Sequence, residues 1–107
     1  MSIAEITVEE VAARLSDGAV LFDVREVDEY VEAHAPGAQL IPLSELAERA
    51  DEFPTEGDLL IICKSGGRSM RVCEFLAERG VQASNVGGGT GAWIRAGFKV
   101  VTGTSPT

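Results

Sequence analysis

The apolar positions of this chain fall into short blocks separated by turn residues. Blocks rich in Val, Ile and Leu are typical of buried strands. They alternate with stretches whose apolar residues recur every three or four positions, as on one face of a helix. Alternating strands and helices of this length favour an α/β domain with a mainly parallel sheet.

The expected strands cover residues 5–7, 19–24, 38–42, 58–63 and 83–86. The expected helices lie between them and cover residues 8–15, 26–33, 44–50, 69–79 and 90–96. Ser44 has a side chain suited to cap the third of these helices. Val27, Tyr30 and Val31 fall on one face of the second helix, which predicts that they belong to the core.

The chain has 107 residues, of which 45% are hydrophobic. This is enough for one compact core and too little for two domains. We therefore expect a single domain over residues 1–102, followed by a flexible, frayed tail at residues 103–107.

The charge balance is acidic, with 17 Asp and Glu against 9 Lys and Arg and a formal net charge of -8. Nucleic acids and anionic membrane surfaces both reward clustered cations, so neither is an expected partner. No apolar run approaches the length of a membrane span, and the first fifteen residues mix acidic side chains into the apolar pattern. These features predict a cytoplasmic protein.

The chain contains two cysteines, Cys63 and Cys73, and one histidine, His34. Two cysteines are too few for a disulfide framework, and with one distant histidine they cannot form a tetrahedral zinc site. We therefore expect reduced thiols, no bound metal and no cofactor.

The stretch LLIICKSGGRS, residues 59–69, ends an apolar strand on the thiol of Cys63. A loop between a parallel strand and the next helix lies where open α/β sheets bind ligands. Gly66 and Gly67 allow the backbone to curl so that successive N–H groups point inward, and the helix expected from Ser69 adds its own free N–H groups. This pattern predicts an anion-binding cradle around Cys63.

Two cations flank the glycines of this loop, Lys64 and Arg68. A positive environment favours thiolate over thiol, so we expect Cys63 to have a lowered pKa and to be nucleophilic. Arg68 near the first turn of a helix opposes the helix dipole, which indicates an anionic partner for it. The alternative, that Cys63 only ends a buried strand, leaves the glycines and the cations unexplained.

The segment CKSGGRS resembles the active-site loop of single-domain rhodanese sulfurtransferases, whose pattern is Cys-x-x-Gly-x-Arg-Ser. FDVRE at residues 22–26, AHAPGAQLIPLSEL at 33–46 and VGGGTGAW at 86–93 resemble further blocks of that family in the same order. The resemblance spans nearly the whole chain. It implies a five-stranded, mainly parallel sheet with helices on both faces.

The resemblance also implies a reaction, in which a thiolate takes a sulfane sulfur from thiosulfate or a related persulfide or polysulfide. Cys63 would carry that sulfur as a persulfide to cyanide, a thiol or an acceptor protein. A thiolate held ionised by its surroundings needs no general base. The implied donor-binding residues are Lys64, Ser65, Gly66, Gly67, Arg68 and Ser69. We expect a monomer.

We expect structural roles for several residues outside the loop. Asp23 and Arg25 follow the second strand and are expected to form an ion pair. His34 is expected to make a structural hydrogen bond, although the Gly and Ile that flank this position in the family are Ala33 and Ala35 here. The remaining candidates are expected in the core: Cys73, Trp93 and Phe98.

Two other functions remain open at this point. A cysteine phosphatase or arsenate reductase also holds a thiolate in an anion cradle, but its loop is one residue longer than the four residues between Cys63 and Arg68. A non-catalytic rhodanese-like module for sensing or protein interaction is the main alternative. The presence of Cys63 weighs against it. The sequence does not distinguish detoxification from delivery of sulfur to an acceptor.

Overall fold

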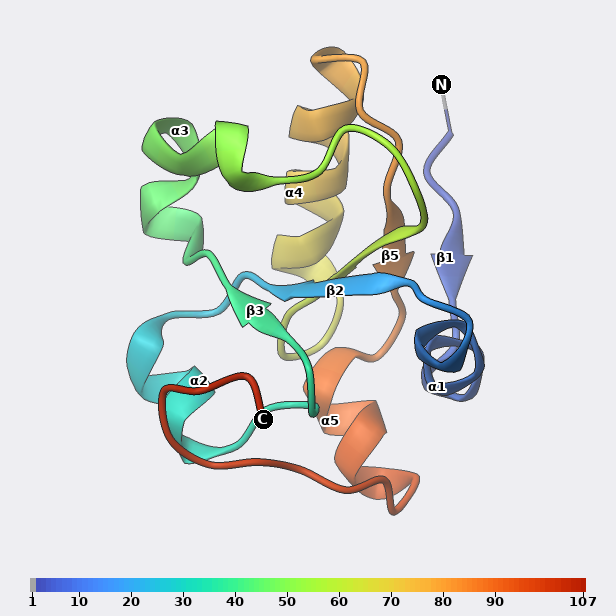
Figure 1. The fold of residues 1–107 in the computed structure, drawn as a ribbon, viewed down its shortest axis with the longest axis vertical. Coiled ribbons are helices and arrows are strands. Elements are labelled where there is room, and N and C mark those ends of the chain that lie inside the picture. The colour runs from blue at the N-terminus through green and yellow to red at the C-terminus, as the bar shows by residue number, and fades with distance from the viewer. Residues whose placement is uncertain (1) are drawn as a thin grey trace.

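Five parallel strands form the sheet of the computed structural model, which describes residues 2–107 (Figure 1). The strand order is β1-β5-β4-β2-β3. The strands are β1 (Glu5–Ile6), β2 (Val20–Asp23), β3 (Gln39–Leu40), β4 (Leu59–Ile62) and β5 (Ser84–Val86). The parallel five-stranded sheet confirms the prediction from the sequence.

Helices cover both faces of this sheet, as expected (Figure 1). They are α1 (Val8–Ser16), α2 (Val27–Glu32), α3 (Leu46–Arg49), α4 (Gly67–Glu78) and α5 (Gly89–Arg95), with 3-10 turns at Leu43–Glu45 and Ala50–Glu52. Within residues 2–107, none of the helices is long and apolar enough to cross a membrane.

The core has two layers, one on each face of the sheet. Leu60 points into the layer shared with α1, α2 and α5, and the next residue, Ile61, points into the layer shared with α4. Both are fully buried, because β4 is a central strand covered on both sides. Trp93 and Phe98 pack together at 4.5 Å between ring centroids, and Cys73 is fully buried, as predicted.

The carboxyl ends of β2 and β4 lie side by side and place the candidate residues at one edge. Asp23, the last residue of β2, pairs in register with Ile62, the last residue of β4. Cys63 follows Ile62 directly, and α4 begins a few residues later. The expected strand-loop-helix arrangement around the thiol is therefore present.

Three local expectations were wrong. Helix α4 begins at Gly67 and not at Ser69, because Gly66 with φ 112° acts as its N-cap. Val27 is 49% exposed, since the six-residue helix α2 turns only part of its surface to the core. Ser44 lies inside a 3-10 turn, where its hydroxyl is 2.8 Å from Glu26 Oε1 and caps no helix.

The C-terminal segment also differs from the expected frayed tail. Gly103 N donates to Val31 O at 2.8 Å, and Gly37 N donates to Pro106 O at 2.8 Å. His34 is fully buried, and its ring nitrogens lie 2.8 Å from the carbonyl oxygens of Tyr30 and Ser105. The predicted structural hydrogen bond of His34 is thus confirmed, and part of its role is to hold the last residues against α2.

Candidate active site

Cys63 lies in a tight loop between β4 and α4. Its side chain is almost fully buried, and its Sγ accepts a hydrogen bond from the backbone N–H of Gly66 at 3.1 Å. The sulfur also lies 3.2 Å from Ser69 Oγ, so the first turn of α4 faces it. The cradle predicted around the thiol is therefore formed by the loop backbone and the Ser69 hydroxyl.

The start of α5 supports this loop from the other side. Thr90 N donates to Cys63 O at 2.8 Å, and Gly91 N donates to Lys64 O at 3.0 Å. A Cβ atom at Gly89 would lie 2.4 Å from Cys63 O, so only glycine permits this approach. The glycines of the VGGGTGAW segment hence bring α5 against the loop.

The pKa values of the two thiols are shifted in opposite directions. Burial raises the pKa of Cys63, but hydrogen bonds from the Ser69 hydroxyl and from the backbone N–H groups of Ser69, Gly66 and Ser65 outweigh burial and leave the pKa lowered. Burial raises the pKa of Cys73 to about 12. Of the two thiols, Cys63 is therefore the one that ionises more readily, and nucleophilic reactivity depends on the thiolate.

A buried polar chain continues from Ser69 to the edge of the sheet. The Ser69 hydroxyl is hydrogen-bonded to Asn85 Oδ1, and Asn85 Nδ2 donates to Glu5 Oε2 and Gly66 O, both at 3.1 Å. Two acceptors at Nδ2 define the orientation of the amide, so Ser69 donates its single proton to Oδ1 when Cys63 is a neutral thiol. Ionised Cys63 attracts the same proton. Asn85 and the thiolate therefore share the Ser69 hydroxyl.

The variant Ser69→Ala is expected to raise the pKa of Cys63, because the hydroxyl stabilises the thiolate. The rate of iodoacetamide alkylation at neutral pH should fall about tenfold, the loss expected for one hydrogen bond to a charged group. The measurement is the pH profile of alkylation in a Cys73→Ala background. Ser16→Ala, on the exposed side of α1, is the control. An unchanged profile in Ser69→Ala would contradict the role of the hydroxyl.

Asp23 and Arg25 form the expected ion pair at the end of β2. Arg25 Nε and Nη2 donate to the two oxygens of Asp23 at 2.9–3.2 Å, and Nη2 also donates to Ala33 O at 2.7 Å. Asp23 is fully buried and Arg25 is 6% exposed. The pair ties β2 to the end of α2 and makes no hydrogen bond to Cys63.

Arg68 has an anionic partner within the chain. Its two amino groups donate to Glu29 Oε1 at 2.7 Å and Oε2 at 2.9 Å. The hydrogen bonds from Arg68 lower the pKa of Glu29 from 4.5 to about 2 despite partial burial. The carboxylate is thus fully ionised above about pH 4.5, and the pair is lost as the pH falls toward 2. Two of the five guanidinium N–H groups of Arg68 are used by Glu29.

Three residues of the site were missed by the sequence analysis: Glu29, Asn85 and Thr90. Asn85 carried a signal, since a polar amide inside an expected buried strand needs hydrogen-bond partners. Glu29 and Thr90 carried none, because their neighbours in space are far away in sequence. Among residues 2–107, no group of three His, Cys, Asp or Glu side chains could hold a metal ion.

Together, the parallel sheet and the cysteine loop at its carboxyl edge define a class of α/β proteins in which a cysteine follows a central strand and lies against the start of the next helix. The Rhodanese-like domain model matches residues 7–96. The chain belongs to the rhodanese-like family.

Three relatives show how far this similarity extends. A sulfurtransferase of Allochromatium vinosum is 33% identical, covering 92% of this chain and 95% of its own. The thiosulfate sulfurtransferase GlpE of Actinobacillus succinogenes is 31% identical, covering 95% and 94%. The crystal structure of a rhodanese-related protein from Thermoplasma volcanium matches with a TM-score of 0.86 and 30% identity, covering 92% and 97%. The similarity therefore extends over nearly the full length of these proteins.

Proposed function

We propose that this protein is an active sulfurtransferase that carries a sulfane sulfur as a persulfide on Cys63. The observation that carries the proposal is the thiol itself, which receives the Gly66 N–H and faces the Ser69 hydroxyl. Donors arranged in this way stabilise negative charge on sulfur. A buried cysteine with only a packing role would have a raised pKa, as Cys73 has.

The reaction has two steps. The Cys63 thiolate attacks the outer sulfur of thiosulfate, the S–S bond of the donor breaks, and sulfite leaves with the electron pair. Cyanide or a thiolate then attacks the outer sulfur of the Cys63 persulfide, and the Cys63 thiolate is regenerated. In the persulfide the negative charge lies on the outer sulfur, one S–S bond beyond Sγ, and the positive end of the α4 dipole favours it there.

The geometry supports catalysis without a general base. The groups that hydrogen-bond to Cys63 Sγ are backbone N–H groups of the loop and the Ser69 hydroxyl, and none of them removes a proton at neutral pH. His34 is committed to two carbonyl oxygens elsewhere. The lowered pKa of Cys63 provides the nucleophile directly.

Thiosulfate, a persulfide or a polysulfide is the proposed donor, and cyanide, a thiol or an acceptor protein is the proposed acceptor. The test is a steady-state assay with thiosulfate and cyanide, in which thiocyanate is measured. We expect turnover that depends on both reagents. Absence of thiocyanate with thiosulfate and with polysulfide would favour a non-catalytic module.

The variant Arg68→Ala is expected to raise the KM for thiosulfate while reducing the free energy of unfolding only slightly. The partly exposed ion pair with Glu29 contributes about 1 kcal/mol or less to stability, whereas the guanidinium lies in the first turn of α4 and can attract a donor anion. Arg71→Ala, on the exposed side of the same helix, is the control. An unchanged KM would remove Arg68 from the donor-binding residues.

A further inference from the structure

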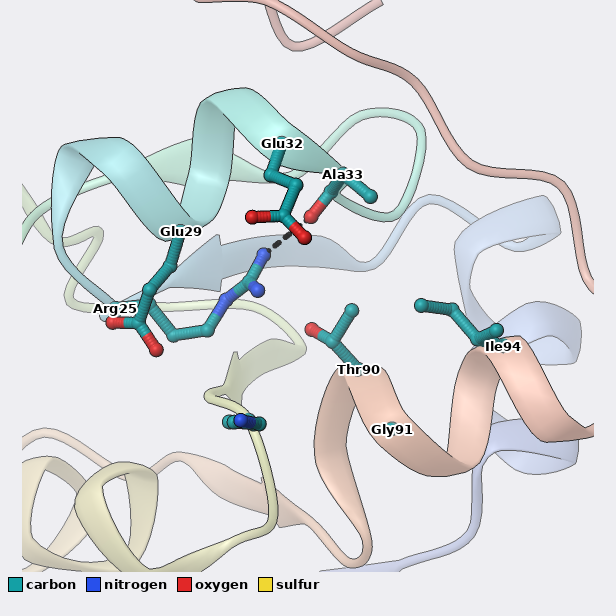
Figure 2. A pocket seen from close by; sticks show the side chains of 8 residues that line it. Arg25, Glu29, Glu32, Ala33, Thr90, Gly91 and Ile94 are labelled. Atoms are coloured by element: carbon teal, nitrogen blue, oxygen red, sulfur yellow. Dashed lines mark hydrogen bonds between the residues drawn. The ribbon is translucent and has the colours of Figure 1, made fainter.

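A small pocket lies beside the Cys63 loop (Figure 2). Its volume is about 190 Å³, which equals the liquid volume of about six water molecules. Its lining residues come from α2 and the segments beside it, from the Cys63 loop and from α5, and are Arg25, Glu29, Glu32, Ala33, Lys64, Thr90, Gly91 and Ile94. The pocket is smaller than most small-molecule sites, so it can take only a small ligand.

The hydroxyl of Thr90 indicates that the pocket binds a polar ligand. Thr90 is 2% exposed, and its Oγ1 is the one buried side-chain oxygen or nitrogen without a hydrogen-bond partner among residues 2–107. Figure 2 shows this oxygen directed toward the Arg25 side of the pocket. An unpaired buried hydroxyl costs folding free energy, so its retention at the pocket wall calls for a partner that binds there.

The charged groups that line the pocket differ in whether they form hydrogen bonds or ion pairs within the described residues. Glu29 is paired with Arg68, and Arg25 uses Nε and Nη2 for Asp23 and Ala33. Arg25 Nη1, the Lys64 ammonium and the Glu32 carboxylate make no hydrogen bond or ion pair with residues 2–107. The pocket thus offers donors for an anion and, separately, one free carboxylate for a cation.

We infer that this pocket binds a small zwitterionic thiol of the α-amino-acid type, which accepts the sulfur from Cys63. Arg25 Nη1, Lys64 and Thr90 Oγ1 hold its carboxylate, and Glu32 holds its ammonium group. A carboxylate beside the entrance favours an amino thiol over a dianion such as thiosulfate, because Glu32 attracts the first and repels the second. The inference rests on the proposed function and names the acceptor that the same site uses.

The pocket borders the backbone of the Cys63 loop. Lys64 lies next to Cys63 in the chain, and Thr90 N is hydrogen-bonded to Cys63 O at 2.8 Å. The thiolate of the bound acceptor attacks the outer sulfur of the Cys63 persulfide. The S–S bond to Cys63 breaks, Cys63 leaves as a thiolate with the electron pair, and the acceptor becomes a persulfide. No oxidant or reductant is needed, since sulfur only moves between two thiols.

The experiment compares three thiols as acceptors for the Cys63 persulfide formed beforehand with polysulfide. L-cysteine carries both an ammonium and a carboxylate, cysteamine lacks the carboxylate, and 3-mercaptopropionate lacks the ammonium. The rate constant of discharge is measured by intact-protein mass spectrometry for each thiol. Each variant is compared with the unmodified protein using the same thiol, so differences in intrinsic nucleophilicity cancel.

The variant Glu32→Gln is expected to act in opposite directions on different reagents. Discharge by L-cysteine and cysteamine should slow about threefold to fivefold, discharge by 3-mercaptopropionate should not slow, and loading by thiosulfate should become faster. General damage to the site would slow all of them. Glu48→Gln, an exposed carboxylate on α3, is the matched control and should change none.

The variants Thr90→Val and Thr90→Ser test the hydroxyl. Thr90→Val should slow discharge by L-cysteine and 3-mercaptopropionate about threefold to tenfold, leave discharge by cysteamine less affected, and raise Tm by roughly 4–8 °C. Thr90→Ser should restore the rates for both carboxylates. A lower Tm in Thr90→Val would show that the hydroxyl has a structural partner and would contradict its assignment to the ligand.

Two outcomes separate the inference from the proposed function. If polysulfide never loads Cys63, the proposed function fails and the inference fails with it. If the persulfide forms and discharges, but Glu32→Gln affects the three thiols alike, the inference alone is overturned. A selective loss for the amino thiols supports it.

Discussion

Cys63→Ser is expected to abolish persulfide formation and to lower kcat/KM for thiosulfate by at least about a thousandfold. The hydroxyl of serine is not ionised at neutral pH and forms no persulfide. The substitution replaces one atom by a smaller one in a loop held by Gly66 and Ser69, so the fold should be retained. The measurements are thiocyanate production and circular dichroism of the purified variant.

Cys73→Ala is the matched control for the other thiol. Cys73 is fully buried and burial raises its pKa to about 12, so it should take no part in the reaction. We expect kcat/KM within about twofold of the unmodified protein, with a loss of stability of about 1–2 kcal/mol from the cavity. Loss of turnover in a folded Cys73→Ala protein, or full activity in Cys63→Ser, would contradict the assignment of the nucleophile.

Asp23→Asn is expected to destabilise the fold by about 3–5 kcal/mol. The substitution leaves the guanidinium of Arg25 buried without its counterion, and Arg25 also holds Ala33 at the end of α2. The free energy of unfolding is measured by urea denaturation.

Two comparisons show whether the cost arises from the unpaired charge. Glu52→Gln removes one partner of the surface residue Arg49 and should cost much less than Asp23→Asn. The double variant Asp23→Leu with Arg25→Met removes both buried charges and should cost less than Asp23→Asn alone. A loss below about 1 kcal/mol in Asp23→Asn would show that the pair gives little support to the edge of the sheet.

The parts of the fold that follow from local pattern were predictable from the sequence. β4 reads as a continuous apolar run because a central parallel strand is buried on both faces, and Leu60 and Ile61 are both fully buried. The loop after it was predictable because a thiol, glycines and cations follow in direct succession. The contact between Asp23 and Arg25 was also predictable, because the two residues are only two positions apart in the sequence.

The parts that depend on tertiary contacts were not predictable. Arg68 required an anion by the dipole argument, but nothing in the sequence identifies Glu29, which lies 39 positions earlier. The last residues read as a tail because they are small and polar, and their order comes from backbone hydrogen bonds to Val31 and Gly37. Val27 fitted the apolar face of α2 by spacing, yet the helix is too short to bury it.

The pocket illustrates the same limit. Thr90 is an ordinary helix residue in the sequence, and its significance appears only once its buried oxygen is found without a partner. Glu32 is likewise one of many acidic residues until α2 brings it to the pocket beside Lys64.

The most direct test of the central claim is intact-protein mass spectrometry of the reduced protein after mixing with thiosulfate and then with cyanide. We expect the addition of one sulfur atom, located on Cys63 by peptide mapping and lost as thiocyanate when cyanide is added. Absence of the adduct with both thiosulfate and polysulfide, while the protein remains folded, would contradict sulfur transfer through Cys63 and indicate a domain that uses this loop for binding.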